Sequence, residues 1–161
     1  MARLLDLLQL GKSRGTKMTG SKTIEIRKLN SMTVGMVSFY SLANSNQTML
    51  VHVSGNFIDN MFVHRHQTDQ LLVVKGQILI TTLHNRQYQY TFLSEKEPTI
   101  ITIPPGVLHG AINLSEEPCI VVNAVLQHGQ SDEKDYRPVK PPIPYDIDWA
   151  KKLFREHSFS N

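Results

Sequence analysis

The stretch Pro104–Asn113, PPGVLHGAIN, combines a turn, a histidine and the start of a strand. Two prolines and a glycine reverse the chain readily, so Pro104–Gly106 predicts a tight turn between two short apolar runs. These runs are Thr99–Ile103 before the turn and Ala111–Leu114 after it. We therefore expect the turn to present His109 at the end of a β-strand.

The same alternation of short apolar runs and turn formers extends outward from this stretch. β-Branched and aromatic residues dominate ten runs, which are Thr23–Leu29, Met32–Tyr40, Thr48–Val53, Met61–His66, Gln70–Val74, Gln77–Leu83, Gln87–Leu93, Thr99–Ile103, Ala111–Leu114 and Cys119–Leu126. Closely spaced runs with short turns between them are typical of strands in antiparallel hairpins. The predicted fold class is therefore all-β, a sandwich or a barrel rather than a parallel sheet with crossover helices.

The chain changes character after Leu126. A polar, glycine-containing segment follows, and half of the eight prolines then lie between residues 138 and 144. Proline fixes φ and donates no ladder hydrogen bond, so this segment predicts an extended connector. Asp148 is a suitable N-cap for a last helix over Trp149–Arg155, and the only tryptophan is expected to pin it to the β domain. We therefore divide the chain into a basic arm (residues 1–22), a β domain (23–126) and a tail packed on that domain (127–161).

Composition restricts the class of protein further. The chain has 161 residues, of which 40% are hydrophobic and 19% charged, with 17 Lys and Arg against 14 Asp and Glu. This composition excludes disorder of the whole chain, and the shortness of its apolar runs excludes a membrane-spanning helix. The basic excess is confined to residues 1–28, which have seven Lys or Arg against two Asp or Glu and no aromatic residue. A basic segment without aromatic residues predicts no nucleic-acid partner.

Cys119 is the only cysteine, so the chain cannot form an internal disulfide. It lies in an apolar run, where we expect a small buried side chain rather than a reactive thiol. The leucine-rich residues 1–10 are too few and too polar for a secretory signal. We therefore expect a cytoplasmic protein.

Histidines provide the candidate chemistry. His64 and His66 flank Arg65 in one of the predicted strands, and residues two apart on a strand point to the same side. Gln70 follows four positions after His66, and His109 lies behind the turn at Pro104. Three imidazoles and one amide oxygen are a suitable ligand set for a divalent transition metal. The candidate metal ligands are therefore His64, His66, Gln70 and His109.

Two of these segments resemble the motifs of the cupin superfamily. Its second motif, Pro-x-Gly-x-x-His-x-x-x-Asn, is matched throughout by Pro104–Asn113. Its first motif has the form Gly, five residues, His-x-His, three or four residues, Glu, six residues, Gly, and is matched by His64-Arg65-His66, Gln70 and Gly76. The resemblance covers residues 23–126. It implies a double-stranded β-helix, which is a small jelly-roll barrel, with the site inside its mouth.

Two residues compete for the acidic position of the first motif. Counting forward from His66 places Gln70 there, whereas counting back from Gly76 places Asp69 there. We favour Gln70, because the residues two and four positions after it are apolar and would then enter the core. Asp69 is then expected to face solvent or the turn. Glutamine in place of a carboxylate leaves the site more positive, which weakens metal binding.

A narrower resemblance is to the RmlC-like cupins, the branch of dTDP-sugar epimerases and ketoisomerases. The similar features are His-x-His followed by Gln, the Ile-Pro-Pro-Gly turn, and a Pro- and Asp-rich tail that ends in Ile-Asp-Trp. The resemblance implies a metal-free barrel that binds a nucleotide sugar, with a histidine, here His66 or His64, that moves a proton beside the sugar ketone. The epimerases also use a tyrosine acid late in the barrel, and Val122–Val125 has none.

Three functions therefore stay open. The first is a small metal-binding cupin, an isomerase- or dioxygenase-type enzyme that acts on a sugar or sugar acid with Fe, Mn, Ni or Zn. The second is a metal-free nucleotide-sugar epimerase or isomerase with His66 or His64 as its base. The third is a barrel that binds a ligand without catalysis. In each case we expect a small-molecule ligand and no membrane partner. We also expect a homodimer, because the strands leave unpaired edges and the N-terminal arm is long enough to pair with a second barrel.

Overall fold

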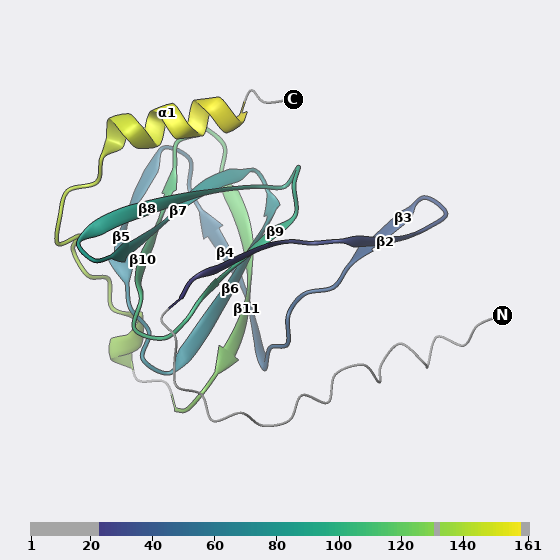
Figure 1. The fold of residues 1–161 in the computed structure, drawn as a ribbon, viewed down its shortest axis with the longest axis horizontal. Helices are drawn as coiled ribbons and strands as arrows, with labels where there is room; N and C mark the ends of the chain where they lie inside the picture. Colours follow the sequence, from purple (N-terminus) through teal and green to yellow (C-terminus); the bar gives the residue numbers. More distant parts are fainter. Residues whose placement is uncertain (1–22, 131–132, 159–161) are drawn as a thin grey trace.

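The computed structural model describes residues 23–130 and 133–158, which form a β-rich body with one α-helix packed on it (Figure 1). The predicted basic arm, residues 1–22, lies outside the described residues. The described elements are, in chain order, β1 Glu25–Lys28, β2 Ser31–Val34, β3 Val37–Tyr40, β4 Gln47–Val53, β5 Phe57–Phe62, β6 Gln67–Lys75, β7 Gln77–His84, β8 Gln87–Ser94, β9 Thr99–Ile103, β10 Leu108–Asn113, β11 Cys119–Gln127, the 3-10 helix η2 Glu133–Tyr136, and α1 Ile147–Ser158.

Two antiparallel sheets make up the body. One has five strands in the order β1-β9-β6-β11-β4, and the other has four strands in the order β5-β10-β7-β8. Most neighbours in these sheets are far apart in the sequence, as β6 shows by pairing with β9 and β11. Strands β2 and β3 form a separate hairpin that projects from the body (Figure 1). The arrangement confirms the predicted all-β class and its jelly-roll form.

The main core fills the space between the two sheets. It contains Val73 of β6, Ile80 of β7, Ile101 of β9 and Val121 of β11, together with Cys119. Inward residues alternate with outward ones along these strands, because successive side chains of a strand point to opposite faces. Burial raises the pKa of the Cys119 thiol to about 11. Its position agrees with the structural role expected for this cysteine.

Helix α1 covers the outer face of the four-stranded sheet. Its residues Ala150 and Phe154 pack against Leu79 of β7 and Ile112 of β10. The Phe154 ring also meets Phe92 of β8 edge-on, with 5.7 Å between the ring centroids. Within residues 23–130 and 133–158, no helix has the length and apolar character that crossing a bilayer requires.

The proline-rich segment runs along the barrel before it reaches α1. Val139 forms an antiparallel bridge with Met61 of β5, with backbone hydrogen bonds of 2.6 and 2.9 Å. The Tyr88 hydroxyl donates to the Ile143 carbonyl at 2.6 Å. The connector is therefore held to the four-stranded sheet by its backbone rather than by its prolines.

The helix cap and the anchor of the tail differ from the prediction. Helix α1 begins at Ile147, and the Oδ1 atom of Asp146 accepts a hydrogen bond from Trp149 N at 2.9 Å. The prediction of Asp148 as the N-cap is wrong, because Asp146 offers the same carboxylate two residues earlier. The prediction that Trp149 pins the helix is also wrong, since its side chain is 46% exposed and Phe154 is the buried aromatic residue.

Candidate active site

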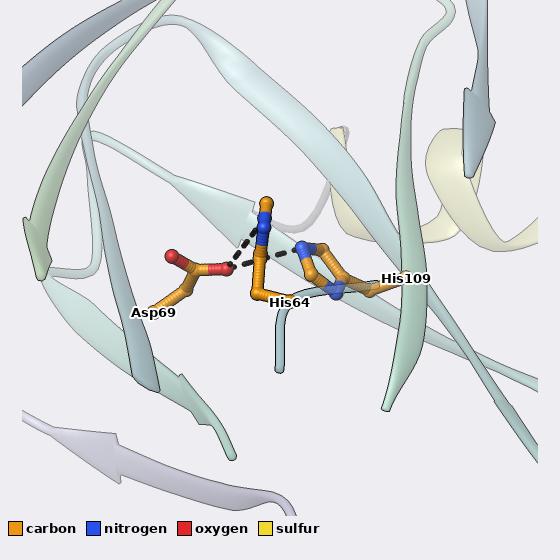
Figure 2. A group of neighbouring side chains, drawn as sticks. All are labelled: His64, Asp69 and His109. Carbon is orange, nitrogen blue, oxygen red and sulfur yellow. Dashed lines mark ion pairs between the residues drawn. The ribbon is translucent and has the colours of Figure 1, made fainter. Parts of the chain in front are cut away.

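Three polar side chains converge inside the barrel. They are His64 from the loop between β5 and β6, Asp69 from β6 and His109 from β10, and all three are buried (Figure 2). The Oδ2 atom of Asp69 lies 3.4 Å from Nε2 of His64 and 3.2 Å from Nε2 of His109. Because one carboxylate oxygen faces both imidazoles, the three side chains form a single cluster.

Strand alternation brings two members of the cluster to the interior. On β6, Asp69 shares its face with Leu71 and Val73, which pack in or against the main core. On β10, His109 and Ala111 both line the interior. The polar cluster therefore continues the apolar core toward one end of the barrel.

The turn before β10 is tied to the loop that carries His64. The Gly106 N–H donates to the His64 carbonyl at 2.7 Å, and Gly106 has a φ of 80°, which glycine adopts without strain. The rings of His64 and His109 lie 5.3 Å apart between centroids. The structure thus brings together two of the four predicted ligands, while their role as metal ligands stays a prediction.

Gln70 is outside the cluster, so its predicted inward position is wrong. Its side-chain amide donates hydrogen bonds to the carbonyls of Asn44 and Ala124, at 2.9 and 2.8 Å. Leu72, on the same face of β6, packs in a separate small core on the outer side of the sheet. Because β6 buries apolar residues on both faces, its pattern does not reveal the inward face. Asp69 takes the acidic position instead.

His66 is also outside the cluster, so the prediction that it shares a face with His64 is wrong. Residues 63–66 connect β5 and β6 outside any strand, and strand alternation does not apply to them. The His66 ring is exposed and lies beside Gly129, and its carbonyl accepts a hydrogen bond from His128 N at 2.7 Å. Of the His-x-His pair, His64 alone is placed to act with Asp69.

Asp69 is held as an anion by its neighbours. Its Oδ1 atom accepts hydrogen bonds from Gln67 Nε2 at 2.8 Å and from Asn123 Nδ2 at 2.9 Å. Burial raises the pKa of Asp69 and is the largest single effect, but the hydrogen bond and charge of His109, the hydrogen bond of Asn123 and the charge of His64 together outweigh it. The net pKa is lowered from its usual value, so Asp69 is ionised at neutral pH.

The tautomer of His109 follows from its hydrogen bond to the backbone. Its Nδ1 atom lies 3.0 Å from the Val107 carbonyl, which can only accept, so Nδ1 carries a proton. In the neutral form, a lone pair on Nε2 would then face the Asp69 carboxylate at 3.2 Å. Two electron-rich atoms at this distance repel each other unless a proton or a metal cation lies between them.

Burial is the largest effect on the titration of His64. Burial lowers the pKa of His64 most, the charge of Asp69 raises it, and the charge of His109 lowers it again. The net pKa is lowered, so the imidazole is neutral at neutral pH. Its Nδ1 atom is buried and makes no hydrogen bond of good geometry with the described residues, although the Asp135 backbone is close enough to raise the pKa of the ring. A neutral imidazole of this kind suits either proton abstraction or metal binding.

A cavity of about 200 Å³ adjoins the cluster. Besides Asp69, the cavity is lined by one other carboxyl group, that of Asp59. Burial raises the pKa of Asp59, and the Asn60 backbone and the charge of His109 lower it by less. The lining is mainly apolar and includes no Lys or Arg. The lining residues, all in the described part of the chain, are Met49, Val51, Val53, Asp59, Phe62, His64, Gln67, Asp69, Leu71, Ile80, His109, Gly110, Ala111, Asn123 and Tyr136.

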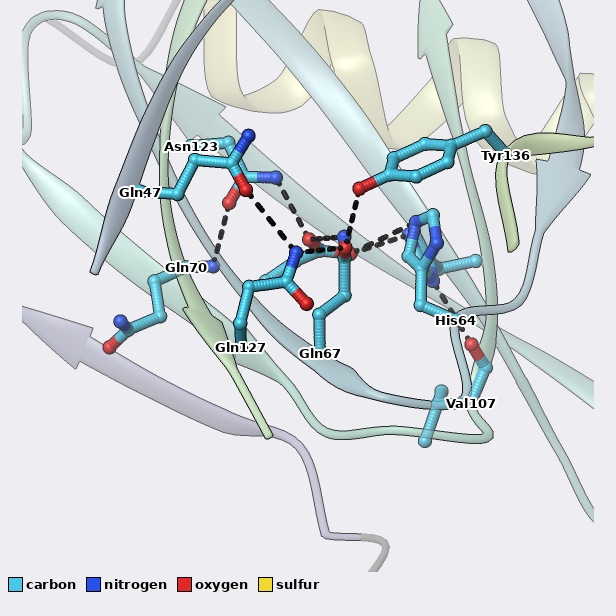
Figure 3. A network of polar contacts seen from close by, with 10 residues as sticks. Gln47, His64, Gln67, Gln70, Val107, Asn123, Gln127 and Tyr136 are labelled. Atoms are coloured by element: carbon cyan, nitrogen blue, oxygen red, sulfur yellow. Dashed lines mark hydrogen bonds and ion pairs between the residues drawn. The ribbon is translucent and has the colours of Figure 1, made fainter. Parts of the chain in front are cut away.

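Tyr136 enters the cavity wall from η2 in the tail. Its ring lies 5.5 Å from the His64 ring between centroids, and its hydroxyl donates to Gln67 Oε1 at 3.0 Å (Figure 3). Because Gln67 also donates to Asp69, one side chain links this hydroxyl to the cluster. The sequence analysis considered a tyrosine only at Val122–Val125 and did not predict Tyr136. This residue follows β11, the last strand of the barrel, and packs back against the barrel. An aromatic residue in an otherwise polar segment was the only signal.

Comparison with protein-family profiles and with curated protein sequences gave no match. Solved structures do match. The chain is similar to a dTDP sugar isomerase from Desulfovibrio desulfuricans G20, with a TM-score of 0.62 and 16% identity over 79% of this chain and 90% of that one. It is similar to a dTDP-4-dehydrorhamnose 3,5-epimerase from Sulfolobus tokodaii, with a TM-score of 0.58 and 19% identity over 83% of this chain and 90% of that one.

A third similar structure is that of the capsular polysaccharide assembling protein CapF from Staphylococcus aureus. The TM-score is 0.52 at 18% identity, over 70% of this chain and 34% of CapF, so the chain spans about a third of that protein. At such identities, likeness shows the fold alone. The chain has the RmlC-like cupin fold that its two motifs resemble. A fold of this kind hosts many activities, so the side chains of the site decide which one it has.

Proposed function

We propose that this chain is a sugar-modifying enzyme that moves a proton at the carbon next to a carbonyl group, as isomerases and epimerases do. The observation that carries the proposal is a buried, neutral His64 beside the ionised Asp69 at an apolar cavity. Among solved structures with this fold are a dTDP sugar isomerase and a dTDP-4-dehydrorhamnose 3,5-epimerase, which supports a substrate of this class.

His64 is the base in this proposal. Its lowered pKa keeps the imidazole unprotonated at neutral pH, so it can accept a proton from the carbon next to the carbonyl. The C–H electron pair moves into the carbonyl and gives an enolate. The charge of Asp69 stabilises the imidazolium that forms, as carboxylates do in other His–carboxylate pairs. Return of a proton to another carbon or another face gives the isomer or the epimer.

Tyr136 is the proton donor that we assign to the second step. Its hydroxyl is on the cavity wall, and its hydrogen bond to Gln67 fixes its position close to the cluster. The residue comes from the tail rather than from a barrel strand. Tyr136 therefore takes the role of the tyrosine acid, because Val122–Val125 contains no tyrosine.

The size and charge of the cavity restrict the substrate. A volume of about 200 Å³ is below the roughly 300–1,000 Å³ of most small-molecule sites, so a sugar ring fits better than a complete nucleotide sugar. The lining residues include no Lys or Arg to neutralise phosphates. We infer that the ketone-bearing sugar enters the cavity and that any nucleoside diphosphate stays outside it.

Deuterium exchange tests the proposed function. A dTDP-4-keto-6-deoxyhexose is incubated with the protein in D2O, and NMR follows the loss of proton signal at the carbons next to the ketone. We expect exchange with the wild type and a loss of about 100-fold or more in His64→Asn. His66→Asn is the matched control, since it changes an exposed histidine of the same loop and should exchange at the wild-type rate.

Three outcomes of this experiment count against the proposal. No exchange with any keto sugar of this class would leave a ligand-binding barrel without catalysis. Equal rates in the wild type and His64→Asn would remove His64 as the base. Loss of exchange in His66→Asn but not in His64→Asn would contradict the assigned geometry.

A metal-dependent form of the site is the second candidate function. His64, Asp69 and His109 offer two imidazole nitrogens and one carboxylate oxygen. The 3.2 and 3.4 Å separations match the roughly 3–3.4 Å between neighbouring donors on one ion with bonds of about 2.1 Å. His109 also donates its Nδ1 proton to a backbone carbonyl, as metal-bound histidines commonly do.

The three donors therefore fit a divalent transition metal such as Fe, Mn, Ni or Zn. When bound, such a metal would polarise a carbonyl oxygen of the substrate. His64, Asp69 and His109 would hold it, in place of the ligand set with His66 and Gln70 that the sequence predicts. With Asp69 as a ligand, the site is less positive than with Gln70, which favours metal binding.

Elemental analysis and metal titration test this candidate. A metal-binding site predicts about one metal per wild-type chain and a loss of affinity of at least tenfold in Asp69→Asn. Gln70→Ala is the control, because it removes an amide that lies outside the cluster and should leave affinity unchanged. Equal affinity in the wild type and Asp69→Asn would contradict the metal site and leave the metal-free proton transfer.

A further inference from the structure

Strand β5 has a β-bulge where it passes the cavity. In its register with β10, the two residues Asp59 and Asn60 are opposite the single residue Ala111, whereas the pairs on either side are one to one. A bulge of this kind inserts one extra residue and breaks the alternation of side chains along the strand. Bulges are over-represented next to active sites, where they point a side chain in a new direction.

The bulge decides which of the two residues reaches the cavity. Phe62, on the same strand, lines the cavity, so regular alternation would put Asn60 inward and Asp59 outward. The order is the reverse, because Asp59 lines the cavity and is partly buried whereas Asn60 is exposed. The charge of His109 lowers the pKa of Asp59, so this carboxyl group is within electrostatic reach of the cluster. The extra residue therefore brings a carboxyl group to the cavity.

Contacts from β10 and from the tail hold the bulge in place. A Cβ atom on Gly110 of β10 would lie 2.9 Å from the Asn60 carbonyl oxygen, so the two strands approach closely here because this residue is a glycine. The Tyr145 hydroxyl, from the segment before α1, donates to the Asp59 carbonyl at 3.3 Å. Strand and tail together fix the backbone of Asp59, so its carboxyl group is a defined part of the cavity wall.

The Asp59 carboxyl group forms no ion pair within residues 23–130 and 133–158. The Asn60 backbone and the charge of His109 favour its ionised form, but burial outweighs both and raises the pKa. A carboxylate at an apolar wall is destabilised in this way until an opposite charge approaches it. A positively charged group of a ligand would therefore stabilise ionised Asp59.

The cavity as a whole also favours a positive ligand group. Its lining contains two carboxyl groups, those of Asp59 and Asp69, and no Lys or Arg. The lowered pKa of His64 keeps this ring neutral at neutral pH, so His109 is the one lining side chain that can offset their negative charge. A cavity lined by one sign of charge attracts ligands of the other sign.

We propose that Asp59 is a specificity-determining residue that binds a protonated amino group of the substrate, so that the cavity selects an amino sugar. The inference rests on the proposed function, because it specifies the sugar on which His64 acts. A hydrogen bond between an ammonium group and a carboxylate is about twice as strong as one between neutral groups. A hydroxyl group in the same place would hydrogen-bond to Asp59 without neutralising its charge. Asp59 therefore favours an amino sugar over the corresponding hydroxyl sugar.

NMR titration of the full chain with free sugars tests this selectivity without catalysis. D-Glucosamine and 3-amino-3-deoxy-D-glucose carry an amino group at different carbons, and D-glucose and N-acetyl-D-glucosamine are uncharged counterparts. The methyl groups of Val51 and Ala111, which line the cavity, report binding. At about neutral pH, we expect at least one of the amino sugars to bind about tenfold or more tightly than both uncharged sugars.

Asp59→Asn removes the charge and keeps the shape of the side chain. It should weaken binding of the amino sugar about tenfold or more and change the affinity for D-glucose by less than about threefold. The matched control is the double variant Asp59→Asn with Asn60→Asp, which keeps the net charge but moves the carboxylate to the exposed residue of the bulge. It should bind the amino sugar as weakly as Asp59→Asn does. Circular dichroism checks folding, and Asp59→Ser replaces Asp59→Asn if that variant is unfolded.

Three results would overturn the inference. The first is a wild type that binds neither amino sugar, or binds both no more tightly than D-glucose. The second is amino-sugar binding that survives Asp59→Asn, which would assign the selectivity to another group. The third is full recovery of binding in the double variant, which would show that net charge acts rather than contact with Asp59.

A failure of the proposed function has a different signature. If the wild type binds an amino sugar through Asp59 but exchanges no proton of any keto sugar in D2O, the reaction is removed and the selectivity of the cavity stands. If exchange depends on His64 but amino sugars have no advantage in binding, the reaction stands and the role of Asp59 is removed.

Discussion

The cavity cluster and the segment from Leu29 to Ile58 depart from the usual distribution of polarity in opposite ways. The cluster buries two imidazoles and a carboxylate, whereas the segment exposes large apolar side chains and has no charged residue. Scattered apolar residues on a surface are ordinary, but buried ionisable groups and contiguous apolar patches are not. The first region therefore gathers ionisable groups inside the barrel, and the second gathers large apolar side chains on the surface.

Among substitutions that leave both histidines in place, removing the charge of Asp69 should have the largest effect on activity. Asp69→Asn keeps the shape of the side chain but leaves His64 without its anionic partner. We expect proton exchange to fall by about 10²–10⁴-fold, the range in which general acid–base groups contribute. Gln70→Asn, next to it but outside the cluster, should change the rate by less than about threefold. Comparable losses of exchange rate in the two variants would contradict the role of Asp69 as the anionic partner of His64.

Two aromatic residues of helix α1 give a second contrast. Phe154 is buried between α1 and the four-stranded sheet, so Phe154→Ala should lower the free energy of unfolding by about 3–5 kcal/mol. Trp149 on the same helix is partly exposed, and Trp149→Ala should cost less than about 1 kcal/mol. Urea unfolding measures both. A larger loss at Trp149 would show that the sequence-based anchor was correct.

Tyr136 separates the two steps of the proposed reaction. Tyr136→Phe removes the hydroxyl and its hydrogen bond to Gln67 but leaves His64 in place. We expect product formation to fall by about 10–100-fold, with exchange of the proton in D2O much less affected. Parallel NMR assays of exchange and of isomerised product measure the two rates. An equal fall in both would make Tyr136 a positioning residue rather than the acid.

The pH dependence of stability is the smallest expected effect. The pKa of His64 in the folded protein is below its ordinary value of 6.5. Between these two pKa values the unfolded state binds more protons than the folded state. The free energy of unfolding therefore falls as the pH decreases from 6.5 to the folded-state pKa. The lowered pKa of Asp69 acts with the same sign below 3.8. The raised pKa of Asp59 changes the stability with the opposite sign. The contribution of His64 therefore has to be obtained by comparing a His64 variant with the wild type.

Urea unfolding at about pH 7 and about pH 5 isolates the contribution of His64. The loss of stability between the two pH values should be smaller in His64→Asn than in the wild type. His66→Asn changes an exposed histidine of the same loop and should keep the wild-type loss. Identical losses in all three proteins would show that His64 does not titrate abnormally.

The Pro104–Asn113 stretch was predictable because its residues act locally. Two prolines and a glycine specify the turn that presents His109, and the whole stretch matches the second cupin motif, so its place at the site needed no knowledge of distant contacts. The ten apolar runs similarly sufficed for the all-β class. In these segments local preference and tertiary packing agree.

Residues 63–70 were not predictable in the same way. The strand ends at Phe62, so His66 escapes the alternation that placed it beside His64. Strand β6 is buried on both faces, which removes the contrast that would have separated Asp69 from Gln70. Tyr136 joins the site from a segment beyond the barrel, and only tertiary structure brings it there. Each error arose where distant contacts override the local pattern.

The most direct test of the central claim, a neutral His64 held against an ionised Asp69, is an NMR titration of the 15N-labelled histidine side chains. Spectra of His64→Asn and His66→Asn assign the two resonances. We predict a His64 pKa clearly below the ordinary 6.5, which shifts further down in Asp69→Asn when the stabilising charge is removed. A His64 that titrates at or above 6.5, or that does not respond to Asp69→Asn, would contradict it.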